Sequence, residues 1–204
     1  MLPKAARLRG LVAGLALAGC CCATASLPPP AAILAQARAA ATYSGSLRVQ
    51  LKGPSLRART RALVAFQRPD ALRIEIPGPA GVRLIAVTRQ GGLTAVFPGE
   101  RAVYEGSASS QELEALLGLR LTPAEVMDLL TGTRAPEVRA YEAHWGPALP
   151  RQIQATLPDG GRLKVDVDSA EAGLPVPALA FEAPKHEGYR SVSAEEARSL
   201  WGGR

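Results

Sequence analysis

The chain has 204 residues, 47% of them hydrophobic and 4% aromatic, with 24 basic and 18 acidic side chains and a formal net charge of +6. This length and apolar content suffice for one domain with a substantial core. The basic residues are nearly all arginine and are scattered along the chain, and aromatic side chains for stacking on bases are sparse. The composition therefore argues against a nucleic-acid-binding protein. Beyond the amino terminus, no hydrophobic run approaches the roughly 20 residues of a transmembrane helix.

The amino terminus has the layout of an export signal. Basic side chains at the start, a short apolar stretch at 11–16 and two small residues lead up to Cys20. The apolar stretch is too short to span a bilayer of about 30 Å as a stable anchor. Residues 1–19 are therefore predicted to be a signal peptide. Without them the chain keeps 185 residues and a formal charge of +3.

All three cysteines of the chain are adjacent, at positions 20–22. Neighbouring cysteines rarely meet the geometry of a disulfide, and metal-binding cysteines come in separated pairs. The stretch "LAGC", ending at Cys20, resembles the bacterial lipobox. The resemblance implies cleavage before Cys20, lipid attachment to its thiol and acylation of the new amino terminus, for instance with palmitate. Export without lipid attachment is the alternative, and neither reading gives Cys21 or Cys22 a role.

The residues after the cysteines form a spacer rich in proline, with three consecutive prolines at 28–30. Such a segment is extended and holds a domain away from the surface to which its end is tied. We expect a lipidated cysteine and flexible tether over residues 20–34, and one domain over 35–204. Within the domain, residues 31–42 at its border are alanine-rich and favour a helix.

From Tyr43 the chain alternates apolar and polar residues with a period of two, which is typical of half-buried strands. Short stretches of this kind follow one another and are bounded by Gly, Pro or Asp, so the pattern predicts an antiparallel meander. The strands expected in this half are residues 43–51, 61–69, 71–79, 82–88, 93–99 and 101–106.

Two helices are predicted to interrupt the sheet, because the apolar period changes to 3.6. The stretch 109–118 begins with a Ser-x-x-Glu capping box and ends at a glycine. The stretch 122–132 begins with Thr122 as its N-cap and Glu125 as the return partner, and it stops at Gly132. After this pair the alternation resumes, and a short capped helix closes the chain. The elements expected there are strands at 137–145, 151–157, 162–168 and 178–184 and a helix at 193–201.

These elements predict an α+β fold. Roughly nine to eleven antiparallel strands form a sheet that must curl, and a curled sheet needs something to fill its concave side. The apolar faces of the two central helices supply it. The expected architecture is a curled, unclosed antiparallel β-barrel with a helical lid or plug.

The sequence offers little for catalysis. His144 and His186 share no metal-ligand spacing, and Asp166 and Asp168 fall on the solvent face of a predicted strand. No serine sits in a nucleophile-elbow context, and no glycine-rich segment joins a strand to a helix as a phosphate cradle does. We therefore predict no catalytic residues, no metal and no cofactor. A hydrolase whose groups meet only in the folded chain is the remaining enzymatic alternative.

With these elements in place, the chain resembles the LolB family of outer-membrane lipoproteins, which receive other lipoproteins from the periplasmic carrier LolA. The resemblance runs from about residue 43 to 167. It is most specific in "RPDALRIEIPGPAGVRLIAV", "LTAVFPGERAVYEG" and "ELEALLGLRLTPAEVMDLLTG". It implies an unclosed antiparallel barrel that encloses an apolar cavity covered by helices.

The apolar side chains on the inward faces are the candidates to line that cavity. By periodicity alone they either pack solidly on one another or leave a hollow, and the resemblance implies the hollow. The candidate acyl-chain cavity residues are Leu47, Val49, Val64, Phe66, Leu72, Ile74, Ile76, Leu84, Leu93, Phe97, Val126, Leu129 and Leu130.

The family also has a protruding turn that presents a large apolar residue, commonly leucine, and helps deliver acyl chains to the membrane. The matching turn here consists of Gly78, Pro79, Ala80 and Gly81. It departs from the family pattern because Ala80 occupies the position of the large residue. Val82 and Ile76 are the nearest larger apolar side chains and are the candidates to take its place.

The resemblance implies a function without turnover. A monomeric acceptor, anchored by Cys20 in the outer membrane and facing the periplasm, takes lipoprotein acyl chains from a LolA-like carrier and helps insert them in the membrane. The alternatives are a lipid or glycolipid carrier of similar fold and an envelope lipoprotein with a filled core.

Overall fold

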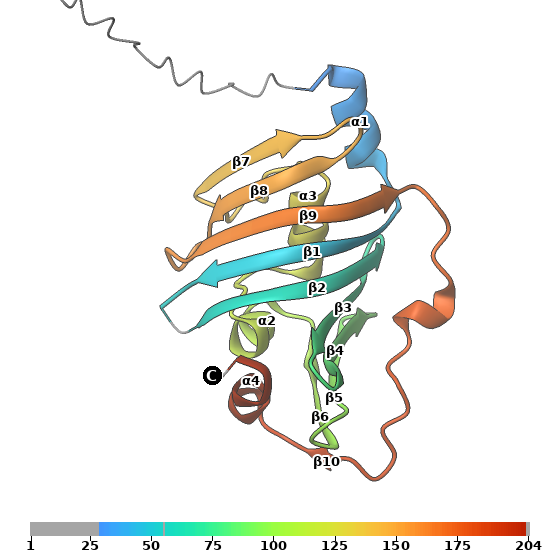
Figure 1. Ribbon diagram of the computed structural model, residues 1–204, viewed down its shortest axis with the longest axis vertical. Helices are drawn as coiled ribbons and strands as arrows, with labels where there is room; N and C mark the ends of the chain where they lie inside the picture. The colour runs from blue at the N-terminus through green and yellow to red at the C-terminus, as the bar shows by residue number, and fades with distance from the viewer. Residues whose placement is uncertain (1–28, 55, 203–204) are drawn as a thin grey trace, which may run out of the picture.

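The structure is a computed structural model that describes residues 29–54 and 56–202. Cys20 and the predicted signal peptide lie outside the described residues. One ten-stranded sheet dominates the molecule (Figure 1). Its strands are β1 Thr42–Lys52, β2 Arg57–Gln67, β3 Ala71–Gly78, β4 Gly81–Arg89, β5 Gly92–Phe97, β6 Ala102–Ser107, β7 Ala140–Trp145, β8 Pro150–Thr156, β9 Arg162–Ala172 and β10 Arg190–Ser191.

The strands lie in the order β10-β6-β5-β4-β3-β2-β1-β9-β8-β7, so β10 and β7 are the two edges and the barrel is not closed. All neighbours pair antiparallel except β10, which runs parallel to β6. The predicted fold class is confirmed: a curled, open sheet of ten strands combined with helices. The short parallel edge strand was not predicted, because two residues carry no readable period.

The helices are α1 Ala31–Ala39, α2 Ser110–Leu117, α3 Pro123–Leu130 and α4 Ala194–Gly202, with a 3₁₀ helix, η1, at Ala178–Phe181. α1 begins within the stretch expected to be a tether and ends before Thr42. None of the helices in the described part of the chain is both long and apolar enough to cross a membrane.

The caps of the two central helices explain where they begin. Thr122 Oγ1 accepts a hydrogen bond from the Glu125 amide at 3.3 Å, and the Glu125 carboxylate accepts one from the Thr122 amide at 2.8 Å, so this predicted capping box is confirmed. Ser109 caps α2 through the Glu112 amide at 3.2 Å. The return bond predicted there is wrong, because the Glu112 carboxylate instead accepts from the hydroxyl of Tyr104.

The main core fills the space between the concave face of the sheet and helices α2, α3 and α4. α4 packs on α2, and Trp201 Nε1 donates to the Leu116 carbonyl at 2.8 Å. One continuous cluster of buried side chains joins the inward faces of β1 to β6, β8 and β9 to these helices. Burial of this apolar surface is the main force that holds the sheet curled.

A second, smaller apolar cluster lies on the outer face of β4, β5 and β6. Ile85, Val87, Val96 and Val103 are buried although they point away from the main core. The chain between β9 and β10 crosses this face, and Phe181 of η1, which packs against β3 and β4, is only 3% exposed.

This crossing corrects one predicted element. Residues 178–184 were expected to be the last strand, but they form η1 and an irregular segment. Proline fixes its own backbone and donates no ladder hydrogen bond, and Pro177 directly precedes this stretch. The apolar residues there cover a finished sheet instead of extending it.

Candidate functional site

The thirteen predicted cavity residues lie together in the structure. Ten are buried, and Val49, Ile74 and Val126 are partly buried against the same cluster. β1 to β5 supply those from the sheet and α3 supplies the other three, as the sequence predicts. In this structure the side chains pack on one another, and their role in holding an acyl chain stays a prediction.

The prediction left out the other half of the same interior. Leu113, Leu116 and Leu117 come from α2, and Ile153 and Val165 come from β8 and β9. The alternation in residues 151–157 and 162–168 marks the last two as inward-facing. The α2 leucines were already visible as a helical stripe, so both signals were present in the sequence.

Arg68, between β2 and β3, connects α3 to the sheet. Its Nη2 lies 2.8 Å from Asp128 Oδ1 and 3.3 Å from Thr131 Oγ1, and its Nε donates to the Ala40 carbonyl at 3.3 Å. From the far side of the sheet, the Tyr141 hydroxyl of β7 donates to the Leu129 carbonyl at 3.1 Å. α3 is therefore held at its carboxyl end by polar contacts from both halves of the sheet.

Two tyrosines of the concave face each lie over a glycine two residues further on, Gly45 after Tyr43 and Gly106 after Tyr104. A Cβ atom built on either glycine would meet the tyrosine hydroxyl closer than atoms normally approach. The Tyr43 ring also stacks on Phe66, with centroids 5.3 Å apart and an interplanar angle of 6°. Each glycine thus makes room for an aromatic ring that lies flat along its strand.

The hydroxyls of Tyr43 and Tyr104 differ in whether they have a hydrogen-bond partner. Burial and the hydrogen bond to the Glu112 carboxylate raise the pKa of Tyr104 to about 12. The Tyr43 hydroxyl is buried and has no hydrogen-bond partner within the described residues, and burial raises its pKa further. A buried hydroxyl without a partner costs about 1–3 kcal/mol. The Tyr43 hydroxyl is therefore a buried donor that the described residues leave unsatisfied.

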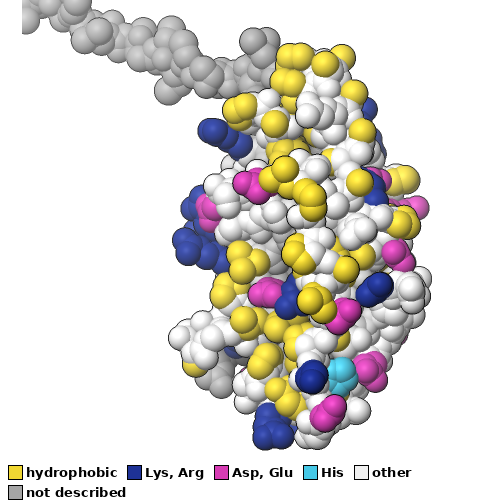
Figure 2. Space-filling view, turned by 90° about the vertical axis from the view of Figure 1, so that its right-hand side faces the viewer, with side chains coloured by type: hydrophobic (Ala, Val, Ile, Leu, Met, Phe, Trp, Pro, Cys, Tyr) yellow, Lys and Arg dark blue, Asp and Glu magenta, His cyan; other side chains and the backbone are white. Residues whose placement is uncertain are grey.

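The apolar interior reaches the surface beside α1. A groove of about 580 Å³ lies between α1, the β7–β8 loop and the end of β9. Seven alanines, a glycine, Leu149 and Leu174 line it, with Gln36 and Glu171 as its polar members. Leu149, Ala170 and Ala172 also pack against the main core. Figure 2 faces this end of the molecule, and hydrophobic side chains gather at its top, where α1 lies.

The groove and the unpartnered hydroxyl are neighbours in the sheet. Tyr43 is opposite Ala172, and Gly45 is opposite Ala170, in the pairing of β1 with β9. Both alanines line the groove. The groove therefore lies next to β1 at the level of Tyr43, although the Tyr43 side chain is only 1% exposed and is not part of the groove lining.

The turn expected to deliver acyl chains joins β3 to β4. Gly78 is opposite Gly81, and Pro79 and Ala80 between them are exposed. Of the two larger side chains nearby, Val82 is 36% exposed whereas Ile76 is 5% exposed. Ile76 belongs to the core, so Val82 is the apolar side chain that this turn presents to solvent. Its part in delivery stays a prediction.

The two histidines lie at the surface, apart from the groove. His144 Nε2 is 3.2 Å from a Glu142 oxygen, and His186 Nδ1 is 2.9 Å from the Pro184 carbonyl. Across residues 29–54 and 56–202, no group of three His, Cys, Asp or Glu side chains is arranged to hold a metal ion.

No protein-family model matches the chain, and no curated protein matches it. Among solved structures, a LolA superfamily protein from Nitrosomonas europaea is similar with 12% identity and a TM-score of 0.42, over 74% of this chain and 96% of that one. A DUF1329 family protein from Desulfovibrio piger has 10% identity and a TM-score of 0.43, over 73% of this chain and 92% of that one. Both likenesses are weak, so membership of the LolB family stays a prediction.

Proposed function

We propose that this protein binds the acyl chains of lipids or lipoproteins and passes them to a membrane. The observation that carries the proposal is the apolar groove beside α1, which joins the surface to the core of the open half-barrel. Its volume of about 580 Å³ lies within the roughly 300–1,000 Å³ common for ligand sites, and such sites are mostly apolar with a few polar groups.

The energetics fit a carrier that consumes no chemical energy. An acyl chain of about 16 carbons, at about 0.8 kcal/mol per buried methylene, gains on the order of 10 kcal/mol by leaving water. Transfer from one apolar site to another costs little by comparison. The direction of transfer is then set by whichever site, and finally whichever bilayer, binds the chain better.

The Tyr43 hydroxyl lies behind the groove lining, on the strand paired with Ala170 and Ala172, and is the polar group that we propose a bound acyl chain reaches. An acyl chain in a lipid or lipoprotein ends in an ester or amide carbonyl, which accepts hydrogen bonds. Donation from Tyr43 to that carbonyl satisfies the hydroxyl that is unpartnered in the empty protein. The site would then discriminate an acyl ester from a plain hydrocarbon.

A more specific version of the proposal adds the features predicted from the sequence: the lipid anchor, the carrier and the delivery turn. Cys20 is lipidated and anchors the protein at the outer membrane, with the domain facing the periplasm. A LolA-like carrier delivers lipoprotein cargo to the groove, and the β3–β4 turn with Val82 contacts the membrane. A lipid or glycolipid shuttle uses the same groove with a different cargo, so mass spectrometry of lipids extracted from the purified protein separates the two.

The test is uptake of a fluorescent fatty acid. We expect saturable binding by the wild-type chain. Leu149→Glu should weaken it at least about tenfold, since a carboxylate is costly in an apolar site. The matched control is Leu179→Glu, at a side chain that is 74% exposed on η1 and outside the groove, and its binding should equal that of wild type. Absence of uptake, or equal uptake by a folded Leu149→Glu protein, would refute the groove as the site.

A cargo-transfer experiment tests separately whether the protein accepts lipoproteins from a LolA-like carrier. LolA loaded with a lipoprotein is mixed with the wild-type chain and with Leu149→Glu, and cargo is followed by affinity separation of the two proteins. Movement of cargo to wild type but not to the variant supports the acceptor role. Fatty-acid uptake without cargo movement would leave an acyl-chain carrier with another donor.

A further inference from the structure

The outer face of the sheet, opposite the core, carries a group of basic side chains on β1, β2 and β9. They alternate with core residues along each strand, so all point away from the interior. The group consists of Arg48, Lys52, Arg57, Arg59, Arg61, Arg162 and Lys164. It is concentrated on the central strands of the sheet and is separate from the acyl-chain groove.

Three of these cations form one row across three adjacent strands. Arg57 is directly opposite Lys52 in β1–β2, and Lys52 is directly opposite Arg162 in β1–β9. Side chains in directly opposite positions have Cβ atoms about 4.5–5.5 Å apart, and like charges there destabilise a sheet. None of these strands is an edge, so protection against edge-to-edge pairing does not explain the row.

Acidic neighbours neutralise only part of the group. Arg48 pairs with Asp168 at 2.9 Å and Lys164 lies 3.6 Å from Asp166. The other five cations have no ion pair with the acidic side chains of residues 29–54 and 56–202. Residues 1–28, 55 and 203–204 contain no Asp or Glu side chain that could supply one.

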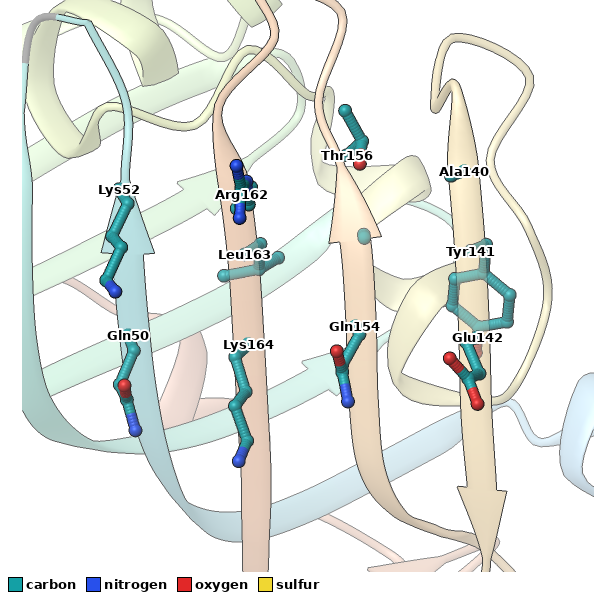
Figure 3. Close-up of a pocket in the computed structure, with 11 residues that line it drawn as sticks. Gln50, Lys52, Ala140, Tyr141, Glu142, Gln154, Thr156, Arg162, Leu163 and Lys164 are labelled. Atoms are coloured by element: carbon teal, nitrogen blue, oxygen red, sulfur yellow. The ribbon is translucent and has the colours of Figure 1, made fainter. Parts of the chain in front are cut away.

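A hollow of about 460 Å³ lies next to this row, over β1, β9, β8 and β7 (Figure 3). Lys52, Arg162 and Lys164 line it, together with Gln50, Gln154 and Thr156. The pairing of the strands puts these groups into two rows, since Lys164 lies between Gln50 and Gln154, and Arg162 lies between Lys52 and Thr156.

The lining supplies many hydrogen-bond donors around one space. Its single acid, Glu142 on β7, stands at the far edge and lies 3.2 Å from His144 Nε2. The unpaired cations Lys52 and Arg162, with Lys164 beside Asp166 and the amide and hydroxyl donors, suit a compact, multiply charged acceptor. A phosphate group has that character, and the guanidinium fork of arginine matches it in two directions.

We infer that this hollow is a binding site for a phosphate group, carried by a lipid headgroup or a small phosphate ester. Lys52, Arg162 and Lys164 contact the phosphate, and Arg57 and Arg59 beside them raise the local positive potential. The site faces away from the groove. One molecule can therefore hold an acyl chain on one side and a phosphate on the other.

The first experiment titrates the full chain with inorganic phosphate, at constant ionic strength in chloride, and follows backbone amide chemical shifts. We expect saturable shifts at residues 50–52, 154–156 and 162–164. The double variant Lys52→Gln/Arg162→Gln should bind roughly twenty-five-fold more weakly, since each cation near a phosphate surface contributes about a factor of five. The control, Arg89→Gln/Lys185→Gln, removes the same charge from exposed positions without a described ion pair and should bind like wild type.

The second experiment identifies the source of the phosphate. Sedimentation with vesicles of phosphatidylglycerol or phosphatidylcholine compares the same three proteins, whose amino termini are identical. Binding to phosphatidylglycerol that the double variant loses and the control keeps assigns the site to a lipid headgroup. Phosphate binding in solution with equal sedimentation of all three proteins assigns it to a soluble ester.

Three results overturn the inference. The first is a set of unsaturable shifts spread over all arginines, and the second is equal phosphate affinity in the double variant and wild type. The third is binding of polyglutamate at these residues without any binding of phosphate, which would make the surface a docking site for an acidic protein.

Discussion

The two halves of the sheet differ in what covers them. β4 to β6 bury apolar side chains on both faces, in the main core inside and in the outer cluster of Ile85, Val87, Val96 and Val103, while η1 packs against β3 and β4. β1, β9, β8 and β7 are covered on the concave face, while their outer face carries polar and basic side chains. The strand sequences reflect this difference in burial. "RLIAVT" of β4 is apolar nearly throughout, whereas "RVQLK" of β1 alternates. Loss of alternation marks a strand with two covers.

The covered half should depend on its outer cover. Phe181→Ala removes a ring that is 3% exposed and should lower the free energy of unfolding by about 3 kcal/mol, near the lower end for buried phenylalanines. Leu179→Ala, at a side chain 74% exposed in the same 3₁₀ helix, should change it by less than about 0.5 kcal/mol. Urea unfolding curves measure both, and equal effects would contradict the role of the cover.

α3 is expected to couple the two halves. Arg68→Ala removes the contacts with Asp128 and Thr131 and should cost about 1–2 kcal/mol, as for a partly buried charged hydrogen bond. Hydrogen exchange should show faster opening of α3 than of the sheet. Arg89→Ala, at the exposed last residue of β4, is the control. Uniform acceleration of exchange across the domain would show that α3 does not open independently.

Removing the hydroxyl of Tyr43 or of Tyr104 tests one polar atom in each half of the sheet, since Tyr43 belongs to β1 and Tyr104 to β6. Tyr104→Phe breaks a hydrogen bond to Glu112 and should destabilise the protein by about 1 kcal/mol. Tyr43→Phe removes an unpartnered hydroxyl, so the empty protein should be as stable as wild type or more stable. Binding of an acyl ester should nevertheless weaken in Tyr43→Phe. Thermal unfolding with and without ligand measures both effects.

The pH dependence of stability is a further test of the Tyr104 hydroxyl. The pKa of Tyr104 is raised from 10.0 to about 12 in the folded chain. Its contribution to stability is therefore fully present below pH 10 and is lost as the pH rises toward 12. Tyr104→Phe should show a smaller loss of stability over this interval than wild type. Identical alkaline profiles would place the relevant proton elsewhere.

Much of the fold was predictable because its signals are local. The period-two alternation from Tyr43, the Thr122–Glu125 capping box and the stop at Gly132 each depend on a few neighbouring residues. They gave the open sheet, the helical pair and the shared interior of the thirteen apolar residues. The outer cover was missed because Phe181 packs on strands about 100 positions earlier, and no local period reports such a contact.

The candidate site was less accessible to prediction. The groove is made mainly of alanines from α1, the β7–β8 loop and the end of β9, and alanine by itself favours a helix without indicating a ligand. The Tyr43 hydroxyl is notable only because the folded chain leaves it without a partner. The basic row arises from the register of three strands, whereas along the sequence the same arginines are scattered.

The position of β1 inside the sheet has a consequence for folding during synthesis. β1 pairs on one side with β2, which follows it directly, and on the other with β9, which begins about 110 residues later. Until β9 has been made, the first strand is an eleven-residue free edge. Such an edge invites pairing with other chains, and contacts so distant along the chain form slowly. The free edge of β1 therefore has to be kept from pairing with other chains until nearly the whole domain has been synthesised.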